Sequence, residues 1–327
     1  MAEPQDNSRL EVVSFGETML RLSPPEGYSL ENAPRFDLFV GGTESNMSIA
    51  FARLGGRAGW VSRLPDNGIG RRIAHEVAVH GVDVSRVIWA EGGRAGLIFI
   101  DTAPPPRGND ILYDRAHSAV AEIRADELDW DYLASAKVLF LTGITPALSA
   151  ACREAWLRAA RETKAKGSRV VLDVNYRAKL WTPAQARATL AEALPSCDVL
   201  VSAHRDLRTI FEMPEDPEAA ARAFAQAYRV PMVVLTLGEE GALCFDGTLR
   251  KAPTYPCEPL DRIGSGDAFV AGFLKGWLEG DVDLALRLGN ASAALKQTFR
   301  GDHSWARLRD VMELMQGGAS NKRHVRR

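Results

Sequence analysis

Short apolar runs alternate with longer helical patterns along most of this chain. EVVSF, RVVLD, DVLVS and PMVVLTL are rich in β-branched and large apolar residues, and stretches with helical spacing separate them. Continuous apolar strands of this kind are buried on both sides. With 327 residues and 46% hydrophobic composition, the chain can bury one large core. We therefore predict an α/β fold with a mostly parallel central sheet and helices on both of its faces.

Two stretches interrupt this alternation. Residues 18–40 and 94–115, with approximate boundaries, hold short strand-like pieces and turn residues such as SPPEG and TAPPPRGND, with no helix between them. We expect them to form a small β lid, built from two insertions into one domain that covers residues 1–317. Long surface loops are the alternative, although such loops are uncommon in compact domains. Residues 318–327 are basic and lack apolar periodicity, so we expect a disordered tail.

Charge and composition exclude several classes of function. Forty basic residues against 42 acidic ones give a net charge of -2, so there is no general electrostatic reason to bind nucleic acid or a membrane surface. No apolar run reaches the roughly 18 residues of a spanning helix, and we expect a cytoplasmic protein. The four cysteines show no CxxC spacing and the six histidines no HExxH spacing, so the sequence suggests no zinc site.

The segment DRIGSGDAFVAGF, residues 261–273, places three small residues directly before an aspartate. Apolar residues at helical spacing follow, so a helix begins close to Asp267. The backbone amides of Gly264, Ser265 and Gly266 can point into one concavity and, with the positive helix end, bind an anion such as a phosphoryl group. A carboxylate beside such a site can accept the proton of an attacking hydroxyl. The alternative is that Asp267 only caps the helix.

A second segment, VGGTESN, residues 40–46, carries paired glycines before another helix. Gly41 and Gly42 allow close approach to the backbone, and the Asn46 amide both donates and accepts hydrogen bonds, which suits a polyhydroxyl ligand. A tight turn followed by a helix cap would explain the segment equally well. Neither the dinucleotide-binding GxGxxG fingerprint nor the GxxxxGK[ST] P-loop occurs in the chain, which argues against a nicotinamide-dependent oxidoreductase.

Taken together, these segments resemble a known family. GGTESN, ARLGG and DNGIG resemble the N-terminal signature of the ribokinase-like (PfkB) carbohydrate kinases, and DRIGSGDAFVAGF resembles their C-terminal signature. The resemblance implies a ribokinase-like fold with a β lid, which agrees with the strand and helix pattern. Within this family, FGETMLRLSPP, LTGITPALS and ALKQTFRGD are similar to segments of 2-keto-3-deoxygluconate kinases, as are YDRAHSA and DVNYRAKLW.

The resemblance also implies roles for individual residues. Asp267 would be the catalytic base, and the amides of Gly264, Ser265 and Gly266 would form the anion hole for the γ-phosphoryl group of ATP. Asp261 matches a position that helps to bind a monovalent cation such as K⁺ in many relatives. The residues that would contact the sugar are Gly41, Gly42 and Asn46, and those that would border the nucleotide are Thr236, Gly238, Gly241 and Asn290. Family members use ATP with Mg²⁺, and some pair through their lids into homo-oligomers.

A 3-deoxy-2-keto sugar acid carries a carboxylate that neutral sugars lack. Its site should therefore hold a cation, and arginine grips a planar carboxylate through two parallel hydrogen bonds. Tyr113, Arg115 and Arg177 match residues that contact the sugar acid in this subfamily. For each arginine the alternative is a structural ion pair with a neighbour such as Asp114 or Asp173.

Two departures from the family pattern stand out. SAHRD, residues 202–206, replaces an Asn-x-x-Glu motif tied to magnesium, so the magnesium ligands stay unassigned and Asp206 is the only candidate acid there. Ile98 stands where a tyrosine is expected, which can alter substrate choice. The sequence predicts an ATP-dependent kinase of the primary hydroxyl of 2-keto-3-deoxygluconate. A kinase of fructose or 5-keto-2-deoxygluconate, or a catalytically silent sugar-binding protein, is the alternative.

Overall fold

The main sheet of the computed structural model, which describes residues 9–103 and 106–317, has eight strands. The predicted tail, residues 318–327, lies outside the described residues. Six strands pair in parallel, whereas the pairs β12–β13 and β13–β14 at one edge are antiparallel. In spatial order the strands are β14 (Leu249–Ala252), β13 (Ala242–Phe245), β12 (Met232–Thr236), β11 (Val199–Ala203), β10 (Arg169–Asp173), β9 (Val138–Thr142), β1 (Val12–Phe15) and β4 (Ala58–Val61).

The apolar strands of this sheet are buried on both faces, as their sequences predict. Side chains alternate between the two faces of a strand. Along β10, Val171 therefore packs into one hydrophobic core, while its neighbours Val170 and Leu172 pack into the core on the opposite face. Val12 and Val13 of β1 divide between the two cores in the same way. This double burial explains why these strands carry no polar face.

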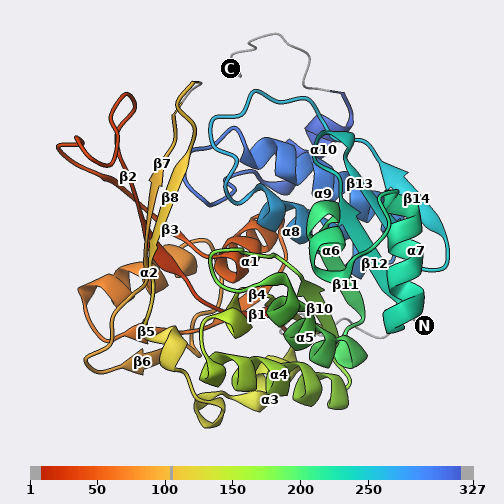
Figure 1. Cartoon of the computed structure of the whole chain (residues 1–327), viewed down its shortest axis with the longest axis horizontal. Helices are drawn as coiled ribbons and strands as arrows, with labels where there is room; N and C mark the ends of the chain where they lie inside the picture. Colours follow the sequence, from red (N-terminus) through yellow and green to blue (C-terminus); the bar gives the residue numbers. More distant parts are fainter. Residues whose placement is uncertain (1–8, 104–105, 318–327) are drawn as a thin grey trace.

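Helices cover both faces of the sheet (Figure 1). The first core is closed by α1 (Thr43–Arg53), α2 (Gly68–Ala78), α8 (Ser265–Leu278), α9 (Val282–Lys296) and α10 (Leu308–Met315). The second core is closed by α3 (Trp130–Ser135), α4 (Ala150–Ala165), α5 (Pro183–Ala193), α6 (His204–Phe211) and α7 (Pro217–Tyr228). The structure thus has the predicted α/β architecture, a mostly parallel central sheet with helices on both faces.

A second sheet projects from the main body, at the left of Figure 1. Its strands lie in the order β3 (Asp37–Gly41), β2 (Met19–Ser23), β7 (Leu97–Asp101) and β8 (Asp110–Asp114). They come from the two stretches predicted as lid insertions, to within one residue. Met19, Ile98 and Ile100 form a small apolar cluster on this sheet. A short parallel pair, β5 (Arg63–Pro65) and β6 (Ile88–Ala90), lies elsewhere in the chain.

No helix within the described ranges is both long enough and apolar enough to cross a bilayer.

The parallel strands all end at one edge of the main sheet, and the segments that follow them lie beside the lid. In open α/β sheets ligands bind at this carboxyl edge. The fold therefore places the expected ligand site between the lid and the ends of β9 to β12.

Candidate active site

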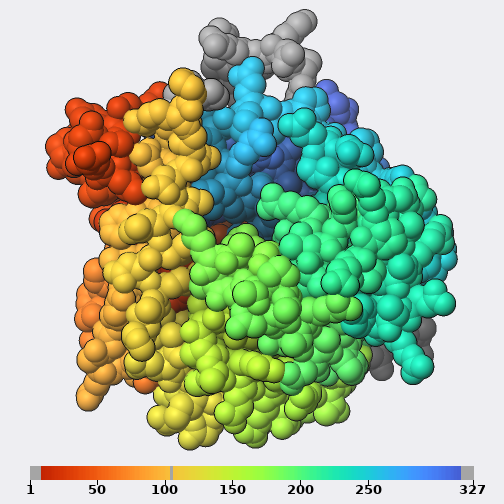
Figure 2. Space-filling view, in the orientation of Figure 1, coloured from red at the N-terminus to blue at the C-terminus, as the bar shows by residue number. Residues whose placement is uncertain are grey.

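Two cavities meet at the start of α8. The first has a volume of about 470 Å³ and lies between the lid and the strand ends; the second, of about 440 Å³, lies on the other side of the helix start. Figure 2 shows the hollow where the lid strands, in red and yellow, approach the blue C-terminal part. Both cavities are lined by Thr236, Arg262, Ser265 and Gly266. A group bound in one cavity can thus reach a group bound in the other.

The helix start is fixed by Gly264. This residue caps α8 with φ of 82°, a left-handed conformation that favours glycine. A Cβ atom at this position would lie 2.0 Å from the backbone oxygen of Asp302, so the segment at Asp302 packs directly against the turn. Both constraints require glycine at position 264, whatever binds there.

The first turn of α8 presents backbone amides toward the cavities. Within the described part of the chain, the N–H groups of Gly264 and Gly266 donate to no other group, whereas the Ser265 amide makes a long hydrogen bond of 3.3 Å to the Arg262 oxygen. Free first-turn amides and the positive helix end favour a bound anion. Arg262 is exposed and borders both cavities, so it adds a cation there that sequence reasoning missed.

Asp267 lies in the first turn of α8 with its side chain buried in the first cavity. Its Oδ2 atom accepts a hydrogen bond of 2.7 Å from Nδ2 of Asn46, at the opening of α1. Burial raises the pKa of Asp267 to about 7, an effect that the Asn46 hydrogen bond opposes and the charge of Asp173 reinforces. A buried carboxylate with a pKa near neutrality is well matched to act as a general base. The structure therefore brings together the two segments that the sequence singled out.

The paired glycines that open α1 also line the first cavity. A Cβ atom on Gly41 would lie 2.3 Å from Oδ1 of Asp302, and one on Gly42 would lie 2.1 Å from the backbone oxygen of Glu17. The absence of side chains here is thus already explained by protein packing. A ligand contact at these glycines stays a prediction.

Arg115 carries a structural ion pair. Its Nε atom donates to Oε2 of Glu17 at 2.7 Å, and the Ser118 hydroxyl donates to the other oxygen of the same carboxylate. The arginine also stacks on the ring of Tyr113, with 5.4 Å between the guanidinium carbon and the ring centre. Glu17, Tyr113 and Arg115 line the first cavity, but the charge of Arg115 is neutralised by Glu17. The partner is Glu17, which lies 98 positions away in the sequence and was not among the expected neighbours.

Arg177 differs from Arg115 in its contacts. It lines the first cavity and is only partly buried, and its guanidinium makes no hydrogen bond or ion pair with any other residue in the described ranges. Its charge lowers the pKa values of Asp173 and Asp267 without a direct contact. On the lid side of the same cavity, Ile98 pairs with Tyr113 across β7 and β8, so an apolar wall faces the cation.

Several acids surround this cavity. Burial raises the pKa of Asp173, at the end of β10, to about 6, and it also raises the pKa of Asp206 in SAHRD. Glu44 lies deeper, where its Oε1 atom accepts hydrogen bonds from Thr142 and Thr145, and burial raises its pKa to about 7. A polyanionic ligand would need cations to approach these carboxylates, and a divalent ion at Asp173 and Asp206 is one means.

The second cavity is formed by the residues predicted to border a nucleotide: Thr236, Gly238, Gly241 and Asn290. Gly241 has φ of 96°, and a Cβ atom there would lie 2.2 Å from the oxygen of Ala252. Asn290 donates from Nδ2 to the oxygens of Ala252 and Pro253 and so holds the same segment. The apolar face needed for a flat ring is supplied by Tyr255, Pro256 and Phe269.

The profile of the pfkB family carbohydrate kinases matches residues 9–305. The chain belongs to this family. The expected ribokinase-like, PfkB-type resemblance is therefore confirmed.

Individual relatives support this family assignment. A 2-dehydro-3-deoxygalactonokinase from Haloferax volcanii is 41% identical over 310 residues, which cover 94% of this chain and 97% of that relative. A 5-dehydro-2-deoxygluconokinase from Shouchella clausii is 32% identical and covers 89% of this chain and 90% of its own. The solved structure of 2-dehydro-3-deoxygluconokinase from Thermotoga maritima superposes with a TM-score of 0.89 at 30% identity, covering 94% of this chain and 99% of that one.

The role of Asp261 as a ligand of a monovalent cation, which the resemblance implies, stays a prediction. Asp261 lines neither cavity. Its carboxylate pairs with Arg21 at 2.8 Å and accepts the Ile263 and Gly301 amides, at Oδ1 and Oδ2 respectively. Arg21 thus already places a positive charge at this carboxylate, which disfavours a further cation there.

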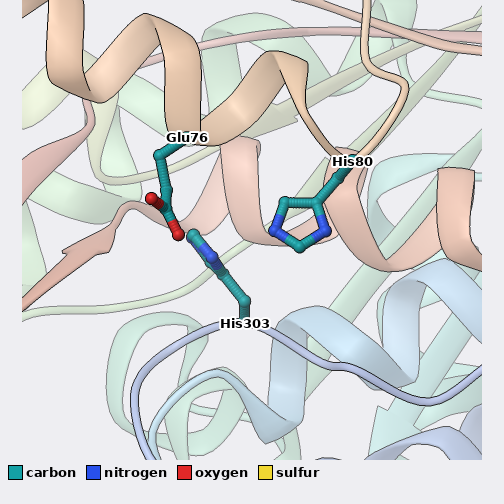
Figure 3. A group of neighbouring side chains, drawn as sticks. All are labelled: Glu76, His80 and His303. Atoms are coloured by element: carbon teal, nitrogen blue, oxygen red, sulfur yellow. The ribbon is translucent and has the colours of Figure 1, made fainter.

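Three side chains of types that commonly bind metal ions lie together outside both cavities (Figure 3). The ligand atoms of Glu76, His80 and His303 lie within 4.8 Å of one another. However, Nη1 of Arg53 lies 3.5 Å from Nδ1 of His80, and because an arginine can only donate, this contact favours the tautomer with the proton on Nε2. The His80 ring also packs edge-on against Trp305. We interpret this group as packing that anchors the segment after α9 to α2.

Proposed function

We propose that this chain is an ATP-dependent kinase that phosphorylates the primary hydroxyl of 2-keto-3-deoxygluconate. The observation that carries the proposal is the position of Asp267, a buried carboxylate with a raised pKa that lines the first cavity directly after Ser265 and Gly266, which line both cavities. The first cavity would hold the sugar acid and the second the nucleotide. The names of the relatives from Haloferax volcanii and Thermotoga maritima support a 2-keto-3-deoxy sugar acid as substrate.

The chemical step follows from this arrangement. The Asp267 carboxylate accepts the proton of the sugar hydroxyl, and the hydroxyl oxygen forms a bond to the γ-phosphorus of ATP. The bond between that phosphorus and the bridging oxygen breaks, and ADP leaves. The amides of Gly264, Ser265 and Gly266 stabilise the negative charge on the transferred group, while Arg262 neutralises charge at the junction. Asn46 orients the base through its 2.7 Å hydrogen bond.

Magnesium would enter with ATP. When bound, the ion offsets the negative charge of the phosphates. Asp173 and Asp206 are the residues that would hold it, because both are buried carboxylates on the first cavity. Magnesium commonly keeps several waters and uses one or two protein carboxylates, so the missing Asn-x-x-Glu motif does not prevent binding. Within the described ranges no three acids of this cavity form a compact ligand group, which also favours a water-mediated mode.

The substrate carboxylate would bind Arg177. Of the two arginines predicted for this role, Arg115 already neutralises Glu17, whereas Arg177 has no such partner in the described chain. We assign Arg115 and Glu17 to shaping the cavity wall and Arg177 to recognition of the acid. A hydrogen bond to a charged group contributes about 1.5–3 kcal/mol, which corresponds to roughly a 10- to 150-fold change in affinity.

The test compares Arg177→Met with the wild type in a coupled ADP-release assay. For 2-keto-3-deoxygluconate we expect KM to rise about 10- to 150-fold in the variant. Slow turnover of fructose, which has no carboxylate, should keep its KM within about twofold. Arg161→Met is the matched control, since that exposed arginine on α4 borders neither cavity. An equal loss for both sugars would mean that Arg177 is structural.

The galactonate-derived epimer is the second candidate, because the Haloferax volcanii relative is named for it. Comparing kcat/KM for the two epimers decides between them. Sugar binding without ADP release would instead support a catalytically silent protein. A homo-oligomer formed through the lid stays a prediction, to which the exposed Leu38 and Leu112 on lid strands lend support. Light scattering of the purified protein tests it.

A further inference from the structure

Lys296, the last residue of α9, is a fully buried cation next to the active site. Its side chain is 0% exposed. The Nζ atom donates to the backbone oxygen of Asp261 at 3.0 Å and to that of Phe299 at 3.3 Å. An ammonium group is rarely buried without specific partners. Burial lowers the pKa of Lys296, and the carboxylates of Asp261 and Asp302 oppose this effect in favour of the charged form.

Arg21 completes the cluster from the lid side. It lies on β2, and its side chain is 2% exposed. Its two terminal nitrogens bridge Oδ2 of Asp261 at 2.8 Å and Oδ2 of Asp302 at 2.9 Å. Two buried cations thus face two buried carboxylates, and the charges balance. We call these four residues, Arg21, Asp261, Lys296 and Asp302, the charge cluster.

The charge cluster lies directly behind the predicted anion hole. Asp261 begins the turn that leads to Gly264, and Asp302 presents its backbone oxygen to the same glycine. Lys296 ties the Asp261 end of this turn to Phe299, in the segment that leads to Asp302. Any shift between these two segments would move the amides of Gly264 and Gly266. The ammonium therefore fixes the geometry of the anion hole from a distance.

A bound monovalent cation would have the same effect as the Lys296 ammonium, because it would hold backbone oxygens of two segments together. Here Lys296 already occupies the Asp261 and Phe299 oxygens with a single positive charge, and Arg21 occupies the Asp261 carboxylate. We propose that the Lys296 ammonium acts as a built-in monovalent cation, so that the enzyme needs no K⁺ for full activity. Lys296 is in this sense a positioning residue, and the inference rests on the proposed kinase function.

The first experiment measures ADP release by the wild type with ATP, magnesium and 2-keto-3-deoxygluconate. Reactions contain either 100 mM KCl or 100 mM tetramethylammonium chloride, whose cation is too large for a site made of backbone oxygens. We expect kcat and the KM for ATP to agree within about twofold between the two salts. Activation of the wild type by K⁺ of about tenfold or more would overturn the proposal.

The second experiment uses Lys296→Met, whose side chain ends one atom short of Nζ and so leaves a space for a small cation. In tetramethylammonium chloride we expect kcat/KM for ATP to fall at least about tenfold, because two buried oxygens lose their donor. KCl should restore at least a third of the wild-type value. Lys251→Met, at an exposed lysine, is the control and should show neither effect. A variant that is fully active without K⁺, or inactive in both salts, would contradict the built-in cation.

Thermal unfolding separates this inference from the proposed function, since it needs no substrate. A specifically bound ion stabilises the folded state. K⁺ should raise the midpoint of Lys296→Met by several degrees over tetramethylammonium, and that of the wild type by less than about one degree. If no sugar is turned over but this pattern holds, the cation inference stands and the function fails. A K⁺-dependent midpoint in the wild type would refute the inference even for an active kinase. If Lys296→Met does not fold, the wild-type results alone decide.

Discussion

Replacing the proposed base, Asp267→Asn, should inactivate the enzyme and stabilise the fold at the same time. Loss of a positioned base typically lowers the rate about 10²- to 10⁴-fold. The asparagine oxygen can still accept the hydrogen bond from Asn46, so the change removes a buried charge without leaving a donor unpaired. Stability should rise because the wild-type carboxylate is ionised at a site that disfavours the charged form.

The size of this gain follows from the pKa of Asp267. Its folded value is about 7 against an ordinary value of 3.8, and this difference corresponds to about 4 kcal/mol. Because the folded pKa is the higher one, the wild type keeps its full stability only below about pH 3.8 and loses it as the pH rises to 7. The advantage of Asp267→Asn should therefore be about 4 kcal/mol at pH 8 and about 2 kcal/mol at pH 5.

Urea unfolding without ligands, followed by circular dichroism at both pH values, measures this difference. Asp110→Asn is the matched control, since Asp110 is exposed on a lid strand and should show no gain at either pH. A variant that is less stable than the wild type at pH 8, or whose gain does not change with pH, would refute the view that Asp267 is held in a strained, buried state. Normal turnover would refute its assignment as the base.

Three further predictions concern its surroundings. In the wild-type enzyme kcat/KM should rise with pH through about 7, as Asp267 loses its proton. Asn46→Ala should move this rise to higher pH, because the Asn46 hydrogen bond lowers the pKa of the base. A pH–rate profile measures both effects. Gly264→Ala should cost at least about 1–3 kcal/mol of stability, because of its left-handed backbone and the clash of a Cβ atom with the Asp302 oxygen, as well as activity, which urea unfolding and ADP release would show. Arg115→Met should cost about 3–5 kcal/mol, because the buried carboxylate of Glu17 would lose its partner, and an unchanged urea midpoint would contradict this.

The fold could be predicted from the sequence because its main signals are local. Continuous apolar strands such as β10 report burial on both faces, and turn-rich stretches mark the lid. The start of a helix close to Asp267 could also be predicted, because apolar residues at helical spacing follow the small residues. The predicted sugar and nucleotide residues all lie on one of the two cavities, although their roles there stay predictions.

Pairings between distant segments could not be predicted. Arg115 was weighed against acids near it in sequence or in the same motifs, but its partner Glu17 comes from the segment between β1 and the lid. Arg21 reaches Asp261 and Asp302, about 240 and 281 positions away, and nothing in the strand MLRLS indicates these contacts. Such pairs depend on how the lid meets the C-terminal segments. The sequence shows only that FGETM and FRGD each contain an acidic residue, and it does not indicate which arginine each would contact.

The most direct test of the proposed kinase is kcat/KM for ADP release with 2-keto-3-deoxygluconate, its galactonate-derived epimer, 5-keto-2-deoxygluconate and fructose, in the presence of ATP and magnesium. We predict that the two 2-keto-3-deoxy acids exceed fructose by at least about tenfold, as expected from one charged hydrogen bond to Arg177. Fructose turned over as well as, or better than, both acids would contradict the assignment of this site to a sugar acid.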